Sequence, residues 1–181
     1  MNAQQDGNLA PWHALYTRHQ HEKSIATMLV HKGHEVFLPL YSATHRWQDR
    51  AKQLCLPLFP CYVFIRGGLE RQLQILSTPG VFAVVGSVGH PAVIPDAQIE
   101  SVRQMADGCV RVEPHPYLAC GDRVRIKSGT LQGLEGILVR KKNGARVVIS
   151  LEMLGRSAAV EVVTSCLEML DRAPDSWGEA V

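Results

Sequence analysis

The sequence has no long apolar run and no paired cysteines. No stretch approaches the roughly 18 consecutive apolar residues of a membrane-spanning helix, so we expect no membrane anchor. The 5 cysteines are odd in number and form no C-x-x-C pair, which argues against a disulfide framework or a zinc finger. Residues 1–10 are polar and lack the apolar segment of a signal peptide. We therefore expect a cytoplasmic protein with reduced thiols.

Catalytic and metal-binding motifs are also missing. The chain contains no G-x-S-x-G and no P-loop, so we expect no enzyme, no catalytic residue and no cofactor. Among the 8 histidines, the close pairs are His19/His21 and His31/His34. Neither pair has cysteine or carboxylate partners at a recognised ligand spacing, so we expect no metal site.

Positive charge is modest and unevenly placed. The formal net charge is +2, which does not by itself identify a polyanionic partner. Residues 10–106 carry nine Lys/Arg against six Asp/Glu, and residues 120–163 carry eight against four. The local balances are therefore +3 and +4, whereas the segment after Cys166 is acidic.

The first half alternates strand and helix signals. Residues 22–32 have apolar side chains at helical spacing and Gly33 is placed to end the helix. Pro95 opens another helix, with an apolar face formed by Ile99, Val102 and Ala106. Strands are expected at 12–17, 35–40, 54–58, 62–66 and 81–85, and a short helix at 72–76. This order predicts an α+β domain over residues 11–106, an antiparallel sheet flanked by helices, after a disordered segment 1–10.

The segment Pro57–Ile65 carries the most information. Proline cannot donate to a central strand ladder, so the strand must start after Pro60. Tyr62 and Phe64 then point to one face, and Val63 and Ile65 to the other. Both faces are apolar, so one can fill a core while the other needs a cover from this chain or from a partner.

The second half is dominated by strand signals. Residues 107–119 have no clear period and are interrupted by glycine and proline, which predicts a flexible linker. Strands are expected at 122–127, 136–139, 146–151 and 158–163, with a turn at Asn143-Gly144. So many short strands predict a small β-barrel over residues 120–172, followed by a tail at 173–181.

Several motifs resemble the NusG family of transcription factors. The segment 121–126 with Gly129 and 136–138 is similar to a KOW motif, which opens an SH3-like barrel. The segments 12–18, 36–39, 57–64 and 79–81 resemble the family's amino-terminal domain, in the family's order. The basic segment 46–52 is similar to that of specialised paralogues of RfaH and UpxY type.

The resemblance implies a face that binds the clamp helices of RNA polymerase. The matching aromatic residues are Tyr16, Phe59, Tyr62 and Phe64. An uncovered apolar face usually marks an interface, and aromatic anchors often dominate its energy. Core packing is the alternative for each ring, and Cys61 is expected to be a packing residue only.

Basic residues at two places are candidates for contact with upstream or non-template DNA. A solvated helix face or a merely soluble loop is the alternative in each case. The candidates are Arg18, His19, His21 and Lys23 after the first strand, and Arg46, Arg50 and Lys52 at a hairpin tip.

The resemblance also implies a partner for the barrel, either a ribosomal protein of NusE type or the termination factor Rho. The matching apolar positions are Leu131, Leu134 and Leu154, for which the barrel core is the alternative. We thus expect a monomeric transcription elongation or antitermination factor without a cofactor. A general NusG that acts with Rho and the ribosome, or a ribosome-associated RNA-binding KOW protein, are the other hypotheses.

Overall fold

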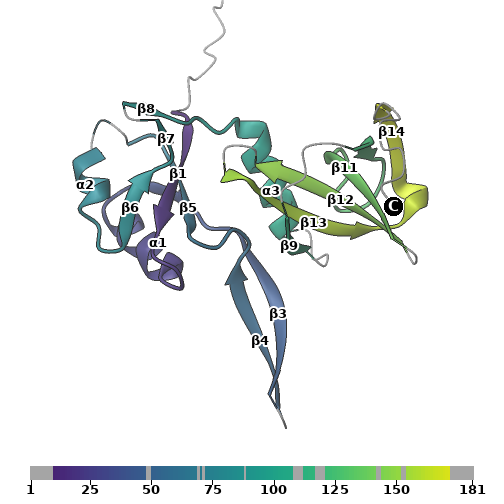
Figure 1. Cartoon of the computed structure of the whole chain (residues 1–181), viewed down its shortest axis with the longest axis horizontal. Helices are drawn as coiled ribbons and strands as arrows, with labels where there is room; N and C mark the ends of the chain where they lie inside the picture. The colour runs from purple at the N-terminus through teal and green to yellow at the C-terminus, as the bar shows by residue number, and fades with distance from the viewer. Residues whose placement is uncertain are drawn as a thin grey trace, which may run out of the picture. The chain divides into compact units, whose positions relative to one another are not determined.

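The structure is a computed structural model of the chain (Figure 1). Contacts between residues divide the chain into two compact units, the first formed by residues 1–38 and 61–96 and the second by residues 39–60 and 97–181. The structure describes residues 10–47, 50–68, 70, 72–87, 89–107, 112–116, 121–141, 144–151 and 154–171.

The first unit is built on a four-stranded sheet in the order β2-β5-β1-β6, in which every neighbouring pair is antiparallel. Two helices, α1 and α2, accompany this sheet, and the short strands β7 and β8 pair with each other. The elements are β1 (Trp12–Thr17), α1 (Glu22–His31), β2 (Glu35–Phe37), β5 (Tyr62–Arg66), α2 (Gln72–Leu76), β6 (Val81–Val84), β7 (Gly86–Ser87) and β8 (His90–Pro91).

The core of the first unit lies between the sheet and its helices. Leu15 of β1, together with Val63 and Ile65 of β5, packs in one cluster with Ile25 and Leu29 of α1. The two helix residues are four positions apart, so they lie on one face of α1. All five side chains are 0% exposed, and burying one aliphatic side chain contributes about 1.5–3 kcal/mol. Gly33, with φ +84°, follows the helix end, as predicted.

The predicted strand start and side-chain alternation of the Pro57–Ile65 segment are confirmed. Strand β4 (Arg50–Pro57) ends at the first proline and β5 begins at Tyr62, after the second. Val63 and Ile65 face the helices, and Phe64 points the other way, where its ring lies 6.1 Å from that of Phe37. Strand alternation therefore separates a helix-covered face from an aromatic face.

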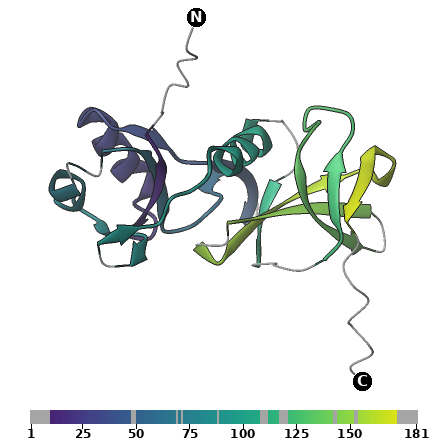
Figure 2. The same ribbon diagram turned by 90° about the horizontal axis from the view of Figure 1, so that it is seen from above.

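The second unit contains a hairpin, a helix and a six-stranded sheet. Strand β3 (Leu40–Trp47) pairs with β4 as a long ribbon, visible in Figure 1. Helix α3 (Asp96–Asp107), whose first residue belongs to the first unit, buries Ile99, Val102 and Met105. The sheet order is β14-β10-β11-β12-β13-β9, with strands β9 (Val112–Pro116), β10 (Arg123–Ile126), β11 (Glu135–Lys141), β12 (Gly144–Leu151), β13 (Arg156–Val162) and β14 (Leu167–Asp171). A 3₁₀ turn (Thr164–Cys166) precedes β14, and Figure 2 shows these strands in green to yellow.

Two strands of the six-stranded sheet differ from the sequence prediction. Strand β9 lies inside the segment 107–119, which was predicted to be a linker, and it pairs with β13. Pro114 and Pro116 do not prevent this strand, because β9 lies at the edge of the sheet, where a residue without an N–H is tolerated. Strand β14 was not predicted, and it pairs with β10. On α3, Met105 is fully buried where the prediction named the half-buried Ala106.

The predicted α+β class with antiparallel sheets is confirmed. Closure of the second sheet into an SH3-like barrel stays a prediction, as do the domain boundaries. Residues 39–60 and 97–106, assigned from the sequence to the first domain, group by their contacts with the second unit. Among the described residues, no helix combines the length and apolarity needed to cross a membrane.

Candidate functional site

Three aromatic side chains form an exposed cluster on the first unit. Tyr16 of β1 is paired directly with Tyr62 of β5, and their ring centroids are 5.8 Å apart. The ring of Phe82, from β6, lies 5.8 Å from that of Tyr16 on its other side. Tyr16 is 45% exposed and Phe82 60% exposed, whereas Tyr62 is half-buried. We call Tyr16, Tyr62 and Phe82 the aromatic cluster.

The cluster is rigid for a surface feature, because its members stand on neighbouring strands. The rings are tilted against each other by 54° and 46°, and tilted aromatic pairs contribute about 0.5–1.5 kcal/mol beyond the area that they bury. Aromatic side chains lose little conformational entropy on binding, so a preformed cluster of this kind is suited to anchor a protein partner.

The structure brings together only two of the four aromatic residues proposed from the sequence. Tyr16 and Tyr62 belong to the aromatic cluster, but Phe59 and Phe64 are 1% and 0% exposed. In this structure the two phenylalanines are therefore packing residues, which was the alternative considered for them. Phe82 was not among the residues proposed from the sequence. Its signal was the apolar run of β6 (Val81–Val84), which, like that of β5, has apolar residues on both faces.

Four of the proposed nucleic-acid-binding residues lie together after β1. Arg18, His19, His21 and Lys23 are all exposed, in the loop before α1 and in its first turn. The main chain of this loop is fixed, since the N–H of Arg18 donates to the carbonyl of Gly80 at 2.8 Å. The segment thus presents basic and imidazole side chains to solvent on a short, anchored loop.

The other three proposed residues, Arg46, Arg50 and Lys52, lie on the β3–β4 hairpin. Its main chain is described, apart from residues 48 and 49, and Trp47 pairs with Arg50 nearest the tip. The side chains of residues 44–52 lie outside what the structure describes. A strand rises about 3.3 Å per residue, so the eight residues of β3 carry the tip roughly 20–25 Å from the hairpin base.

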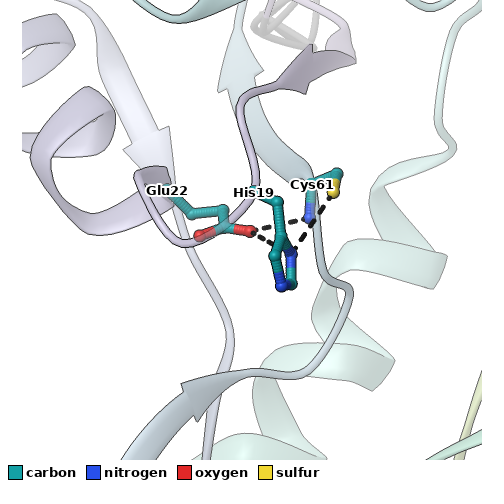
Figure 3. Close-up of side chains that lie close together, drawn as sticks. All are labelled: His19, Glu22 and Cys61. Atoms are coloured by element: carbon teal, nitrogen blue, oxygen red, sulfur yellow. Dashed lines mark hydrogen bonds and ion pairs between the residues drawn. The ribbon is translucent and has the colours of Figure 1, made fainter.

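His19, Glu22 and Cys61 converge at the end of β1 and the start of β5 (Figure 3). The His19 Nδ1 atom lies 3.7 Å from the Cys61 Sγ atom and 3.9 Å from the Glu22 Oε1 atom. The backbone N–H of Cys61 donates to the same Glu22 oxygen at 2.8 Å. We call these residues the triad. The triad has no signature at short sequence spacing, because Cys61 is 42 residues from His19.

The proposed partner-binding leucines of the second unit are buried. Leu131, Leu134 and Leu154 are 3%, 2% and 7% exposed, which agrees with the alternative that they belong to the core. The exposed side chains of β10 instead form ion pairs with the neighbouring strands. The Arg125 Nε atom donates to Glu135 at 2.8 Å, and this hydrogen bond is the main cause that raises the pKa of Arg125 above its usual value.

Comparisons with known proteins agree with the fold. The family model described as transcription termination factor nusG matches residues 10–103. A solved structure described as domain interaction in Thermotoga maritima NusG is 21% identical in sequence to this chain, with a TM-score of 0.55. The match covers 89% of this chain and 97% of that chain. The MjSpt4:Spt5 complex in conformation A is 14% identical, covers 89% of this chain and 99% of that chain, and has a TM-score of 0.30, too low to support an argument. The first match covers more than half of the chain, and the second shows the same fold.

Proposed function

Because this chain belongs to the NusG family of transcription factors, we propose that it binds RNA polymerase through the aromatic cluster and promotes elongation. The observation that carries the proposal is the preformed set of rings on three neighbouring strands of one sheet, in which Tyr16 and Phe82 are exposed and Tyr62 is half-buried. An apolar helix pair, such as the clamp helices of the polymerase, is the kind of partner that such a set of aromatic anchors fits.

The proposed mechanism is selection of one polymerase state. A factor that binds the closed clamp more tightly than the open clamp lowers the population of open, paused states. A tenfold preference corresponds to about 1.4 kcal/mol, so a modest difference in affinity is enough to reduce pausing or termination. This mechanism requires binding and no chemical step by the factor.

The basic residues fit a secondary contact with DNA near the polymerase. Arg18, His19, His21 and Lys23 offer exposed side chains on one anchored loop, suited to phosphate groups of a single strand. Arg46, Arg50 and Lys52 lie on the projecting hairpin, where basic residues would make positioning contacts. Glu22, in the first turn of α1, is negatively charged and compensates the partial positive charge at the start of the helix. The side chains of the loop, and not the helix terminus, would therefore contact the DNA phosphates.

The predicted barrel, residues 120–172, is the proposed recruiting module, with a ribosomal protein of NusE type or Rho as the partner. A tethered module works at high effective concentration, so a weak partner contact is sufficient. Because Leu131, Leu134 and Leu154 are buried, other side chains of the predicted barrel would have to contact this partner.

A specialised antiterminator is our more specific proposal, with a general NusG as the alternative. The basic segment 46–52 supports the specialised role, and the formal net charge of +2 speaks against a ribosomal RNA-binding protein. Genome-wide occupancy of the tagged protein separates the two. A specialised factor is expected on a few transcription units, and uniform occupancy would contradict this assignment.

The polymerase contact is tested with a Tyr16→Ala/Tyr62→Ala double variant. We expect loss of binding to core polymerase and loss of the effect on pausing in a single-round transcription assay. Leu73→Ala is the matched control, because Leu73 is 84% exposed on α2, which packs on the opposite face of the sheet through Ile75. Undiminished binding by the folded double variant would refute the proposed contact.

A further inference from the structure

The triad lies outside the aromatic cluster, and its residue types are those of a transition-metal site. We propose that His19, Glu22 and Cys61 bind a divalent ion of the Zn²⁺ class, a function that goes beyond polymerase binding and does not depend on it. The imidazole, carboxylate and thiol ligand atoms all lie within 4.8 Å of one another, and they come from the loop after β1, from α1 and from the residue before β5 (Figure 3).

Two of the three distances between the ligand atoms are close to those of tetrahedral coordination. Usual Zn–S, Zn–N and Zn–O bond lengths put a sulfur and a nitrogen ligand about 3.6 Å apart, and a nitrogen and an oxygen ligand about 3.3 Å apart. The observed separations are 3.7 Å between Cys61 Sγ and His19 Nδ1, and 3.9 Å between His19 Nδ1 and Glu22 Oε1. The exposed His19 ring, whose side chain is 65% exposed, has to move by only about 0.6 Å to close the longer gap.

Two of the three ligands are held in place before any ion binds. The Glu22 side chain is 3% exposed and accepts the backbone N–H of Cys61. The carbonyl of Cys61 accepts the N–H of Thr17 at 2.8 Å, so the main chain of Cys61 is fixed on both sides. Preorganised ligands lose little entropy on binding, which favours a site with only three protein ligands.

The backbone of Cys61 supplies an independent observation. Its φ is +69°, in the left-handed region, which residues other than glycine adopt at a cost of about 1–3 kcal/mol. Such strain is common at functional positions. This strained backbone holds the Cys61 thiol beside an imidazole and a nearly buried carboxylate, an arrangement that metal binding explains.

Charge and ligand type select the ion. A thiolate and a carboxylate carry two negative charges, which a divalent cation neutralises, and this compensates the burial of the Glu22 carboxylate. The mixed sulfur, nitrogen and oxygen set favours Zn²⁺ over Mg²⁺ or Ca²⁺, which prefer oxygen ligands alone. Three protein ligands leave a fourth position for water or for an external donor.

Cobalt substitution tests the site in the full-length protein. Titration of the reduced chain with Co²⁺ should produce a thiolate-to-cobalt charge-transfer band that saturates at one equivalent and disappears when Zn²⁺ is added. Cys61→Gly should abolish the band, and this variant should stay folded because glycine adopts positive φ freely. His19→Ala and Glu22→Gln should each weaken Co²⁺ binding at least tenfold, and Gln at position 22 can still accept the Cys61 N–H.

Matched variants exclude other thiols and histidines. Cys55→Ser removes an exposed cysteine, and His31→Ala removes an exposed histidine at the other end of α1, and both should leave Co²⁺ binding unchanged. Zn²⁺ should also slow alkylation of Cys61, measured at that residue by mass spectrometry. The proposal is overturned if the wild-type chain gives no band, if the band survives in Cys61→Gly, or if His19→Ala and Glu22→Gln both bind Co²⁺ as the wild type does.

Discussion

Phe64 and Phe82 offer a matched test of the proposed polymerase contact. The two residues have the same side chain and belong to the same sheet, but Phe64 is 0% exposed and Phe82 is 60% exposed. Truncating each to alanine should therefore separate stability from binding. Phe64→Ala should act on the free energy of unfolding, and Phe82→Ala on the affinity for polymerase.

The expected magnitudes follow from burial. Removing a fully buried phenylalanine ring costs about 3–5 kcal/mol, a large part of the about 5–15 kcal/mol that stabilises a typical domain. Full burial of a phenylalanine contributes about 1.5–3 kcal/mol, so the 40% of Phe82 that is covered accounts for about 0.6–1.2 kcal/mol. If Phe82 anchors the partner, its loss should weaken binding at least tenfold, or about 1.4 kcal/mol.

Two measurements check this. Urea unfolding followed by tryptophan fluorescence gives the change in stability, and binding to core polymerase on a sensor surface gives the change in affinity, at a temperature where each variant is folded. A Phe64→Ala variant within 1 kcal/mol of the wild-type stability would refute the assignment of Phe64 to packing. A stable Phe82→Ala variant with wild-type affinity would remove Phe82 from the interface.

Three further predictions concern strain, packing and charge. Cys61→Val should destabilise the protein by about 1–3 kcal/mol in urea unfolding, because a branched side chain at φ +69° is strained, whereas Cys61→Gly should be neutral or stabilising. Gly136→Ala should lower the free energy of unfolding by about 1–3 kcal/mol or more, because its Cβ would lie 2.6 Å from both a methyl group and a carbonyl oxygen of β12. Gly155→Asn should lower it by less than about 1 kcal/mol, because Gly155 has φ +56° and open space around it. Arg18→Ala should lower the slope of log affinity against log salt for single-stranded DNA by about 0.7, and an unchanged slope would mean that Arg18 contacts no phosphate.

Much of the fold could be predicted because the strands of the first unit are short apolar runs bounded by proline, glycine or polar residues. Val63 and Ile65 were placed on one face of the strand, opposite Tyr62 and Phe64, from the period of two, and the structure shows that their face packs against the helices. The end of α1 was predictable because its apolar residues stop shortly before Gly33, a residue type that commonly follows the end of a helix. Strand β9 escaped prediction because its prolines are read as breakers until its edge position in the sheet is known.

The candidate site was only partly predictable, for a different reason. Period 2 assigns a side chain to a face, but it does not say how much of that face is covered. Tyr62 and Phe64 share a face of β5, yet Phe64 is fully buried and Tyr62 is half-buried at the exposed cluster. Phe82 belongs to the cluster because its ring contacts that of Tyr16, and this contact depends on the order and register of β1 and β6. Neither the covering of a sheet face nor the order and register of its strands can be predicted from the local sequence.

The aromatic cluster and the triad are connected through the main chain at one residue. Pro60 has no N–H to donate, so Cys61 is the first donor before β5. Its positive φ accompanies an N–H directed at the Glu22 carboxylate, while its carbonyl accepts from Thr17, the neighbour of Tyr16. The carboxylate thus anchors the residue directly before β5, whose first residue, Tyr62, pairs with Tyr16. An ion bound at the triad would be held by Cys61, the residue next to Tyr62. The proposed metal site and the aromatic cluster are therefore linked through the main chain of Cys61.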